Sequence, residues 1–340
     1  MTTVKDILLR TTDFLRDKGV DQPRLEAELL LSHALARGRM ELYLSFDQPL
    51  EDAELAALRP LVRRRANREP LYWILGSKGF HDIELLCHTD VLVPRSDTEC
   101  LVEAVLARLP SDFTGFIADV GAGTGAVGLA LAAARAGLKV YQTDVSAAAL
   151  ANTRANVQAL GLGQRVAVLE GPLLEPVPPH RPIDIVVSNP PYIPTGDIRG
   201  LDAEVGVHEP RLALDGGPDG LDVYRALLPE AARRCRLGVA VEIGHDQGPA
   251  VSTLFRRAGL VDVEVLKDLG GRDRVVVGRR RDACWPAEPD TVPVGEAVVI
   301  PDATTEVDAP AGDPVVVLDD APEDVPLDEN GDPLPVIVRD

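Results

Sequence analysis

The first part of the chain has its apolar residues at helical spacing. They recur at the spacing of one buried helix stripe over residues 4–15, and again over residues 25–36. Asp21 precedes the second stretch and is expected to cap that helix. The same periodicity predicts a third helix from residue 52 to about residue 67. Residues 1–68 are therefore expected to form a small helical domain.

Beyond this domain the pattern changes to strands. Residues 69–94 carry β-type residues interrupted by Gly76 and Gly79, which predicts a β-hairpin linker. From residue 116 onward, short apolar runs alternate with helical stretches, which is typical of a mostly parallel sheet covered on both faces. The expected strands are 116–120, 139–143, 165–169, 183–187 and 239–243, followed by an antiparallel edge hairpin of 261–266 and 274–277. We assign this α/β domain to residues 95–280.

Composition separates a tail from this body. Residues 281–340 contain 16 acidic and 2 basic residues and 10 of the 28 prolines. Such a segment cannot bury enough apolar surface to offset its ordering entropy, so we expect it to be disordered. The tail holds most of the formal charge of -19, and the rest of the chain is nearly balanced. This balance argues against broad neutralisation of nucleic-acid phosphates.

The four cysteines are widely separated, which suggests neither a disulfide framework nor a cysteine-based zinc site. No metal is expected. The N-terminus is too polar for a signal peptide, and no apolar stretch approaches the roughly 20 residues that span a bilayer. We therefore expect a cytoplasmic protein.

The arginines near the end of the third helix have two interpretations, of which a solvated helix end is favoured over a docking surface for an RNA-rich or acidic partner. They are Arg63, Arg64, Arg65 and Arg68.

A glycine-rich turn follows the first strand of the α/β domain. Residues 118–128 leave a buried strand, turn through Gly121, Gly123 and Gly125, and enter an alanine-rich helix. Glycines let the backbone turn tightly and let a ligand approach closely. Asp144 ends the next strand, where a carboxylate can bind both hydroxyls of a ribose. Together these features indicate an adenosine-type cofactor, although a dinucleotide site would look nearly the same.

The fourth strand ends in Asn189, Pro190, Pro191 and Tyr192. The prolines stiffen the loop and remove two backbone donors, so carbonyl oxygens remain as acceptors. Together with the Asn189 side-chain oxygen, they could hold both hydrogens of a planar NH₂ group while Tyr192 packs against its plane. Such an amine is a poor nucleophile because its lone pair is delocalised. Oriented acceptors would favour the pyramidal nitrogen that forms in the transition state.

With this loop, the sequence resembles the class I methyltransferases that use S-adenosylmethionine, and within them the HemK-type protein glutamine N5-methyltransferases. The likeness extends over about residues 5–280 and implies a Rossmann-like catalytic sheet. Besides residues 189–192, it rests on residues 69–71, 74–76, 93–99, 209–217, 219–221, 242–244, 246–248, 267–269 and 272–274.

The resemblance implies a substrate and a set of site residues. The substrate would be the glutamine of the Gly-Gly-Gln motif in class 1 peptide chain release factors, which the N-terminal helical domain helps to hold. Apart from the resemblance, we expect a monomer. Asn189, Pro190 and Tyr192 would be catalytic, and with Pro191 they would bind the substrate. The implied cofactor-binding residues are Asp119, Gly121, Ala122, Gly123, Thr124, Gly125, Asp144, Leu173 and Asn189. One departure is Pro172, which stands where the family often has an aspartate that meets the adenine amino group.

Two other enzyme functions share the loop. A DNA adenine-N6 methyltransferase also acts on a conjugated NH₂, but it needs a basic cleft for a flipped base, and the body of this chain is nearly neutral. Methylation of a ribosomal-protein glutamine is the closer alternative, and residues 209–217 favour the release factor. No direct nucleic-acid substrate and no membrane association are expected.

Overall fold

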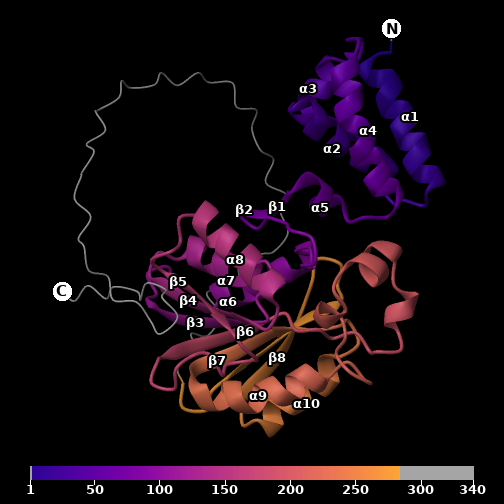
Figure 1. Ribbon diagram of the computed structural model, residues 1–340. Helices are drawn as coiled ribbons and strands as arrows, with labels where there is room; N and C mark the ends of the chain where they lie inside the picture. Colours follow the sequence, from indigo (N-terminus) through magenta and orange to yellow (C-terminus); the bar gives the residue numbers. More distant parts are fainter. Residues whose placement is uncertain (1, 284–340) are drawn as a thin grey trace, which may run out of the picture. The chain divides into compact units, whose positions relative to one another are not determined.

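The computed structural model describes residues 2–283 (Figure 1). The acidic tail predicted for residues 281–340 lies outside this range, apart from its first three residues. Within residues 2–283, no helix is both long enough and apolar enough to cross a membrane.

The N-terminal part is a bundle of helices around one apolar core. They are α1 (Val4–Asp17), α2 (Pro23–Leu35), α3 (Arg39–Leu44) and α4 (Asp52–Ala66). Leu8, Leu15 and Leu30 are fully buried in its core, as their helical spacing predicts. The short α3 was not expected, because six residues carry too little periodicity. The expected cap at Asp21 is wrong: α2 begins at Pro23 after Gln22, which makes no side-chain cap hydrogen bond.

The linker begins with one helical turn and continues as a hairpin. Helix α5 (Leu71–Leu75) precedes β1 (Ser77–Phe80) and β2 (Ile83–Leu86), so the first residues assigned to the hairpin are helical. Pro70 begins this turn, and Gly76, in the left-handed conformation, ends it. The β1 and β2 strands pair antiparallel, as the sequence predicted.

The α/β part is built on a seven-stranded sheet of order β5-β4-β3-β6-β7-β9-β8. Its strands are β3 (Gly115–Val120), β4 (Leu138–Asp144), β5 (Val166–Glu170), β6 (Ile183–Ser188), β7 (Cys235–Glu242), β8 (Val261–Lys267) and β9 (Asp273–Arg279). The first five are parallel, and β9 pairs antiparallel with both β7 and β8. The predicted Rossmann-like sheet with an antiparallel edge hairpin is confirmed.

Helices cover both faces of this sheet (Figure 1). One face carries α6 (Glu99–Leu106), α7 (Ala126–Ala134) and α8 (Ala147–Ala159). The other carries α9 (Asp222–Arg234) and α10 (Gly248–Arg257). Each layer forms its own apolar core against the sheet, which explains why the central strands read as continuous apolar runs. Single turns η1 (Ser96–Thr98), η2 (Ile198–Gly200), η3 (Glu204–His208) and η4 (Arg211–Ala213) lie in the connections.

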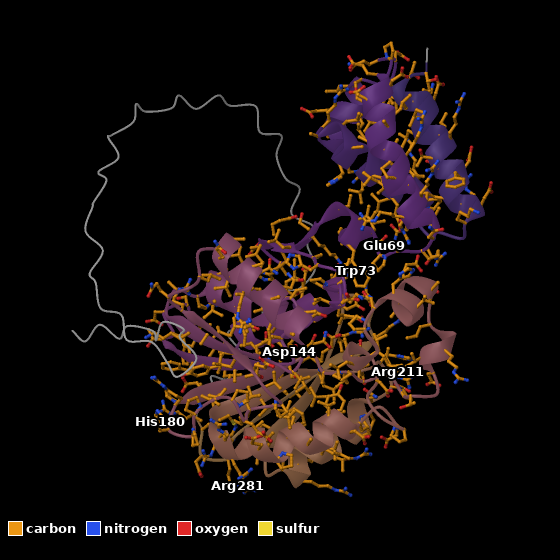
Figure 2. The ribbon with its side chains drawn as sticks, in the orientation of Figure 1. Glu69, Trp73, Asp144, His180, Arg211 and Arg281 are labelled. Atoms are coloured by element: carbon orange, nitrogen blue, oxygen red, sulfur yellow. The ribbon has the colours of Figure 1, made fainter. Side chains whose placement is uncertain are left out.

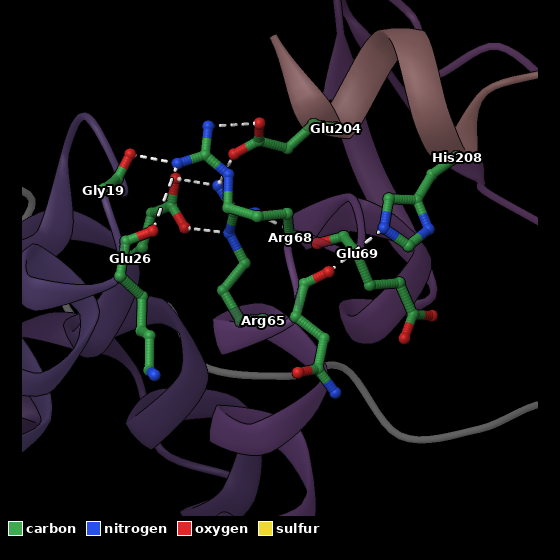
Figure 3. Close-up of polar contacts among 9 residues, drawn as sticks. Gly19, Glu26, Arg65, Arg68, Glu69, Glu204 and His208 are labelled. Carbon is green, nitrogen blue, oxygen red and sulfur yellow. Dashed lines mark hydrogen bonds and ion pairs between the residues drawn. The ribbon is translucent and has the colours of Figure 1, made fainter.

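The arginines at the end of α4 join the helical bundle to the loop after β6 (Figure 3). Arg65 is buried and forms ion pairs with Glu26 of α2 and, at 2.6 Å, with Glu204 of η3. Arg68 also pairs with Glu204, at 2.5 Å. The favoured interpretation of a solvated helix end is therefore wrong for Arg65, because its guanidinium is an internal bridge between two parts of the chain.

Candidate active site

A cavity of about 220 Å³ opens at the carboxyl ends of β3, β4 and β6. The chain reverses its strand order between β3 and β6, and doubly wound sheets bind their ligands at such a point. Figure 2 labels Asp144, at the end of β4. The predicted site residues that line the cavity are Gly121, Gly123, Asp144, Leu173, Asn189, Pro190 and Pro191. Residues from both the glycine loop and the Asn-Pro-Pro-Tyr loop therefore share one cavity.

The glycine loop is shaped by left-handed backbone at Gly121, Gly123 and Gly125. A Cβ atom placed on Gly123 would meet no protein atom within 4 Å, so this glycine borders open space on the cavity side. A Cβ on Gly125 would lie 2.8 Å from a methyl carbon of Leu129, so this glycine serves packing. The loop thus offers bare backbone to a ligand on one side and fits closely against α7 on the other.

Asp144 is placed to bind hydroxyl groups. One of its carboxylate oxygens accepts from the Gly123 amide at 2.9 Å, and the other accepts from the Ser146 amide at 2.8 Å. An ionised carboxylate has about four acceptor positions, so each oxygen can accept one further hydrogen bond. The carboxylate is therefore held rigidly and still has capacity for the two hydroxyls of a ribose.

Four further predicted site residues are not among those that line the cavity, namely Asp119, Ala122, Thr124 and Gly125. Asp119 is buried and accepts the amide of Gly128 at 2.8 Å, which ties β3 to the first turn of α7. Burial raises the pKa of Asp119 to about 7, and the Gly128 hydrogen bond partly offsets this rise. The contacts of Asp119 are thus those of a residue that holds the loop in shape.

The loop after β6 presents acceptors to the cavity. Asn189 donates its Nδ2 to the Thr98 hydroxyl at 3.1 Å. Among residues 2–283, none donates a hydrogen bond to Asn189 Oδ1 or to the Pro190 carbonyl. Gln247 donates to the Tyr192 carbonyl at 2.9 Å and so fixes the far end of the loop. Two acceptors in a stiff frame are therefore available at the cavity wall.

Tyr192 supports this loop from behind. It packs against the core under α9 and is not among the residues that line the cavity. Its hydroxyl donates to Glu242 at 3.3 Å. Burial, followed by the charge of Glu242, raises the pKa of Tyr192, which keeps the phenol protonated. The expected packing of Tyr192 against the target amide stays a prediction.

Glu242, the hydrogen-bond partner of Tyr192, is a residue to which the sequence reasoning gave no role. It ends β7, is 1% exposed, and has one carboxylate oxygen, Oε2, without a hydrogen-bond partner in residues 2–283. Burial raises its pKa to about 7, while Thr98, Arg274 and Tyr192 act in the opposite direction. A buried acid with a pKa raised in this way is a common feature of functional sites. The sequence did offer one signal for Glu242, because the residue lies at the end of a predicted parallel strand, where such sheets bind their ligands.

Two loops that received no role in the sequence reasoning complete the cavity wall. The linker contributes Leu92, and the segment after β6 contributes Leu212. These loops are tied together by Glu209, which accepts from the Val93 amide at 3.2 Å and pairs with Arg95 at 2.5 Å. The pairing is partly buried, because the Glu209 side chain is 1% exposed.

The end of the cavity beyond Asp144 is apolar. Pro172 and Leu173 line it together with Val145. Leu173 adopts a left-handed conformation, and its carbonyl accepts from the Thr143 hydroxyl at 2.7 Å. This wall can pack against a flat aromatic base by apolar contact, and neither Pro172 nor Leu173 has a carboxylate to offer it.

Comparisons with known proteins agree with this geometry. Residues 6–76 match the family model described as the PrmC N-terminal domain, and residues 97–202 match the methyltransferase small domain. The chain is 44% identical over 279 residues to the release factor glutamine methyltransferase of Geobacter sulfurreducens, covering 82% of this chain and 96% of that protein. It is also 44% identical to the corresponding protein of Caulobacter vibrioides, covering 81% of this chain and 96% of that protein.

Among solved structures, the chain is similar to a release factor-specific protein-(glutamine-N5) methyltransferase from Alicyclobacillus acidocaldarius. The identity is 30%, the match covers 57% of this chain and 98% of that one, and the TM-score is 0.34. The sequence relatives cover both the helical domain and the sheet, so the likeness is not confined to the cofactor-binding part.

Proposed function

The chain belongs to the family of release factor glutamine methyltransferases, and from this premise we propose that Asn189 and Pro190 hold the target glutamine of a class 1 peptide chain release factor for methylation. The enzyme is a protein-glutamine N5-methyltransferase, and its cofactor is S-adenosylmethionine. When bound, this cofactor supplies a methyl group made electrophilic by its sulfonium.

The cavity suits this cofactor. Asp144 retains acceptor capacity on both carboxylate oxygens for the ribose hydroxyls. Gly123 leaves the open space that a methionine chain requires. Val145 and Leu173 supply an apolar wall for the adenine. Recognition of the adenine through apolar contact explains how Pro172 can stand where the family often has an aspartate.

Asn189 Oδ1 and the Pro190 carbonyl are the two acceptors for the target amide. A carboxamide nitrogen is a poor nucleophile because its lone pair is shared with the carbonyl. Two fixed acceptors on its N–H groups stabilise the nitrogen as it becomes pyramidal and attacks the methyl group, which is stabilisation realised mainly in the transition state. Holding the nitrogen in line with the methyl carbon supplies much of the remaining acceleration.

The partner is a class 1 release factor, whose target is the glutamine of its Gly-Gly-Gln motif. The helical domain of residues 1–68, joined to the catalytic domain of residues 95–280 by the linker of residues 69–94, is proposed to hold this protein substrate. We further propose a monomer that works in the cytoplasm and has no nucleic-acid substrate. The near-neutral body supports the last point, because it lacks the basic charge that binds phosphates broadly.

One observation supports these roles above the others: Asn189 and Pro190 line the same cavity as Gly123 and Asp144. If the Asn-Pro-Pro-Tyr loop faced away from the glycine loop, it could not bring the nitrogen of the target amide to the cofactor. The test incubates the purified protein with S-adenosylmethionine and an unmodified class 1 release factor. Peptide mass spectrometry is expected to find a gain of one methylene on the motif glutamine.

Parallel reactions distinguish the alternatives. A release factor in which that glutamine is replaced by alanine should gain no methyl group. Ribosomal proteins and duplex DNA test the other two substrates that share this loop. Methylation of either in preference to the release factor would overturn the proposed partner.

Asn189→Ala is expected to lower turnover by about a hundredfold or more, the cost of losing one oriented transition-state partner. The dissociation constant for S-adenosylmethionine, measured by calorimetry, should change much less. Gln158→Ala is the matched control, because Gln158 carries an exposed carboxamide on α8, outside both the cavity wall and the helical domain. Wild-type turnover in Asn189→Ala would contradict the assigned role.

A further inference from the structure

We infer that Thr98, backed by Glu242, is a positioning residue that fixes the orientation of the Asn189 carboxamide, so that its oxygen is the end available to the substrate. The inference rests on the function proposed above for Asn189 and extends it to the residues that make this asparagine an acceptor.

The orientation of Asn189 is a chemical requirement of the site. An asparagine side chain has an acceptor oxygen at one end and a donor NH₂ at the other, and the two ends have nearly the same shape. Only the oxygen can accept a hydrogen from the substrate amide. A rotated Asn189 would place its own donor against the donor of the substrate, and the site would repel its target.

The Thr98 hydroxyl occupies the donor end of Asn189. Asn189 Nδ2 donates to Thr98 Oγ1 at 3.1 Å, across 91 residues of sequence. Because the carboxamide is planar, this bond turns Oδ1 toward the opposite side. No residue within the described range 2–283 donates to that oxygen, and Asn189 is part of the cavity wall.

Thr98 makes no alternative use of its hydroxyl in the backbone. It stands at the N-cap position of α6, where a threonine usually accepts from the first-turn amides, yet it makes no side-chain cap hydrogen bond. It is also 3% exposed, so water does not compete freely for its oxygen. The Thr98 hydroxyl is therefore available for hydrogen bonds with neighbouring side chains.

Glu242 offers an acceptor for the hydrogen of the Thr98 hydroxyl. A hydroxyl can donate or accept, and it would allow both orientations of Asn189 if its hydrogen were free. The Thr98 hydroxyl is near enough to the Glu242 carboxyl group to lower its pKa. The buried Oε2 of Glu242 has no hydrogen-bond partner in residues 2–283, so it is an acceptor toward which the Thr98 hydrogen can turn. The Thr98 oxygen then remains only as an acceptor, and only the NH₂ end of Asn189 can face it.

The turn that carries Thr98 is held from outside the site. Arg274 of β9 is nearly buried and pairs with Asp97 of η1 at 3.1 Å and with Asp268 at 3.1 Å. Tyr192 anchors Glu242 from the other direction at 3.3 Å. Strand β9, η1 and the loop after β6 thus hold Thr98, Asn189 and Glu242 relative to one another.

The experiment compares Thr98→Val with Thr98→Ser in the release factor assay. Valine keeps the shape of threonine but has no hydroxyl, so kcat is expected to fall at least about tenfold, while KM for the release factor and the dissociation constant for S-adenosylmethionine change less than about threefold. Serine retains the hydroxyl and is expected to keep kcat within about threefold of wild type. The melting temperature of each variant shows whether the fold is intact.

A double-mutant cycle tests that Thr98 acts through Asn189. In the Asn189→Ala background there is no carboxamide to orient, so Thr98→Val should lower kcat by less than about twofold. Full additivity of the two losses would overturn the inference, as would a serine variant as poor as the valine variant. Wild-type kcat in Thr98→Val would do the same.

These outcomes are separate from those of the proposed function. If the wild-type protein does not methylate the release factor, the proposed function fails. If the wild-type protein methylates it and the Thr98 variants match wild type, only the orientation role fails.

Discussion

Glu242 makes the stability of the folded protein depend on pH. Burial raises its pKa from an ordinary value of 4.5 to about 7, because the charged carboxylate is taken out of water. The folded protein therefore binds this proton more tightly than the unfolded chain does. The stability that Glu242 contributes is present below pH 4.5 and is lost as the pH rises toward 7.

Glu242→Gln removes this titration while keeping the shape of the side chain. Relative to the variant, the wild type is expected to lose up to about 3 kcal/mol of unfolding free energy between about pH 4 and about pH 8. Urea denaturation of both proteins across this range measures the difference. A difference that does not change with pH would contradict the raised pKa of Glu242.

At the scale of elements, the glycine loop separates a binding role from a packing role. Gly123 and Gly125 both have left-handed backbone, so an alanine at either position costs about 1 kcal/mol in strain. Only at Gly125 would the added Cβ also press on Leu129, at 2.8 Å. At Gly123 the added methyl would project into open space on the cavity side.

Gly125→Ala is therefore expected to lower the melting temperature more than Gly123→Ala does. Gly123→Ala is expected to lose little stability but to bind S-adenosylmethionine more weakly. Thermal unfolding without cofactor and calorimetric titration with it separate the two effects. Equal losses of affinity and of stability in the two variants would show that the loop does not divide these roles.

The junction of α4 and η3 depends on one buried guanidinium. Arg65 is 4% exposed and holds Glu26 and Glu204 together, and removing it leaves two partly buried carboxylates facing each other. Arg65→Ala is expected to lower the unfolding free energy by about 3 kcal/mol, measured by chemical denaturation. Arg63→Ala is the matched control, because Arg63 is exposed on the same helix and should change stability by less than about 0.5 kcal/mol. Similar losses in both variants would contradict the bridge.

At the scale of the whole molecule, the last strand completes the sheet. Strand β9 lies between β7 and β8, and beyond it the Arg280 amide still donates to the Leu237 carbonyl at 2.7 Å. Arg279 also donates to the Ala283 carbonyl at 3.1 Å. The chain is thus tied to the sheet through residue 283.

Truncation after Ala283 is expected to leave kcat unchanged and to shift the melting temperature by less than about 2 °C, because the sheet and its last contacts remain. A truncation that also removes Asp273–Arg279 is the control, and it should fail to fold because β8 loses its neighbour. A folding defect in the first truncation would show that residues 284–340 contribute to the stability of the body.

The sequence by itself determined the layers of this protein. The apolar runs of the central strands are long and local, and burial on both faces makes each run readable without its neighbours. The cofactor loop and the Asn-Pro-Pro-Tyr loop could be found for a related reason, since each directly follows such a strand. Elements shorter than two turns, such as α3 and α5, were missed or misassigned because they have too few residues for a period.

Tertiary structure alone decided which polar groups meet. Arg65 bridges two parts of the chain because it meets Glu204, 139 residues away. The Thr98 hydroxyl does not cap its helix and instead accepts a hydrogen bond from Asn189, 91 residues away. Glu242 reaches the Tyr192 hydroxyl because β7 ends next to β6, which leads into the Asn-Pro-Pro-Tyr loop. Hydrogen bonds and ion pairs act over a few ångströms, so their partners follow from how the strands and helices pack. No pattern of neighbouring residues along the chain specifies them.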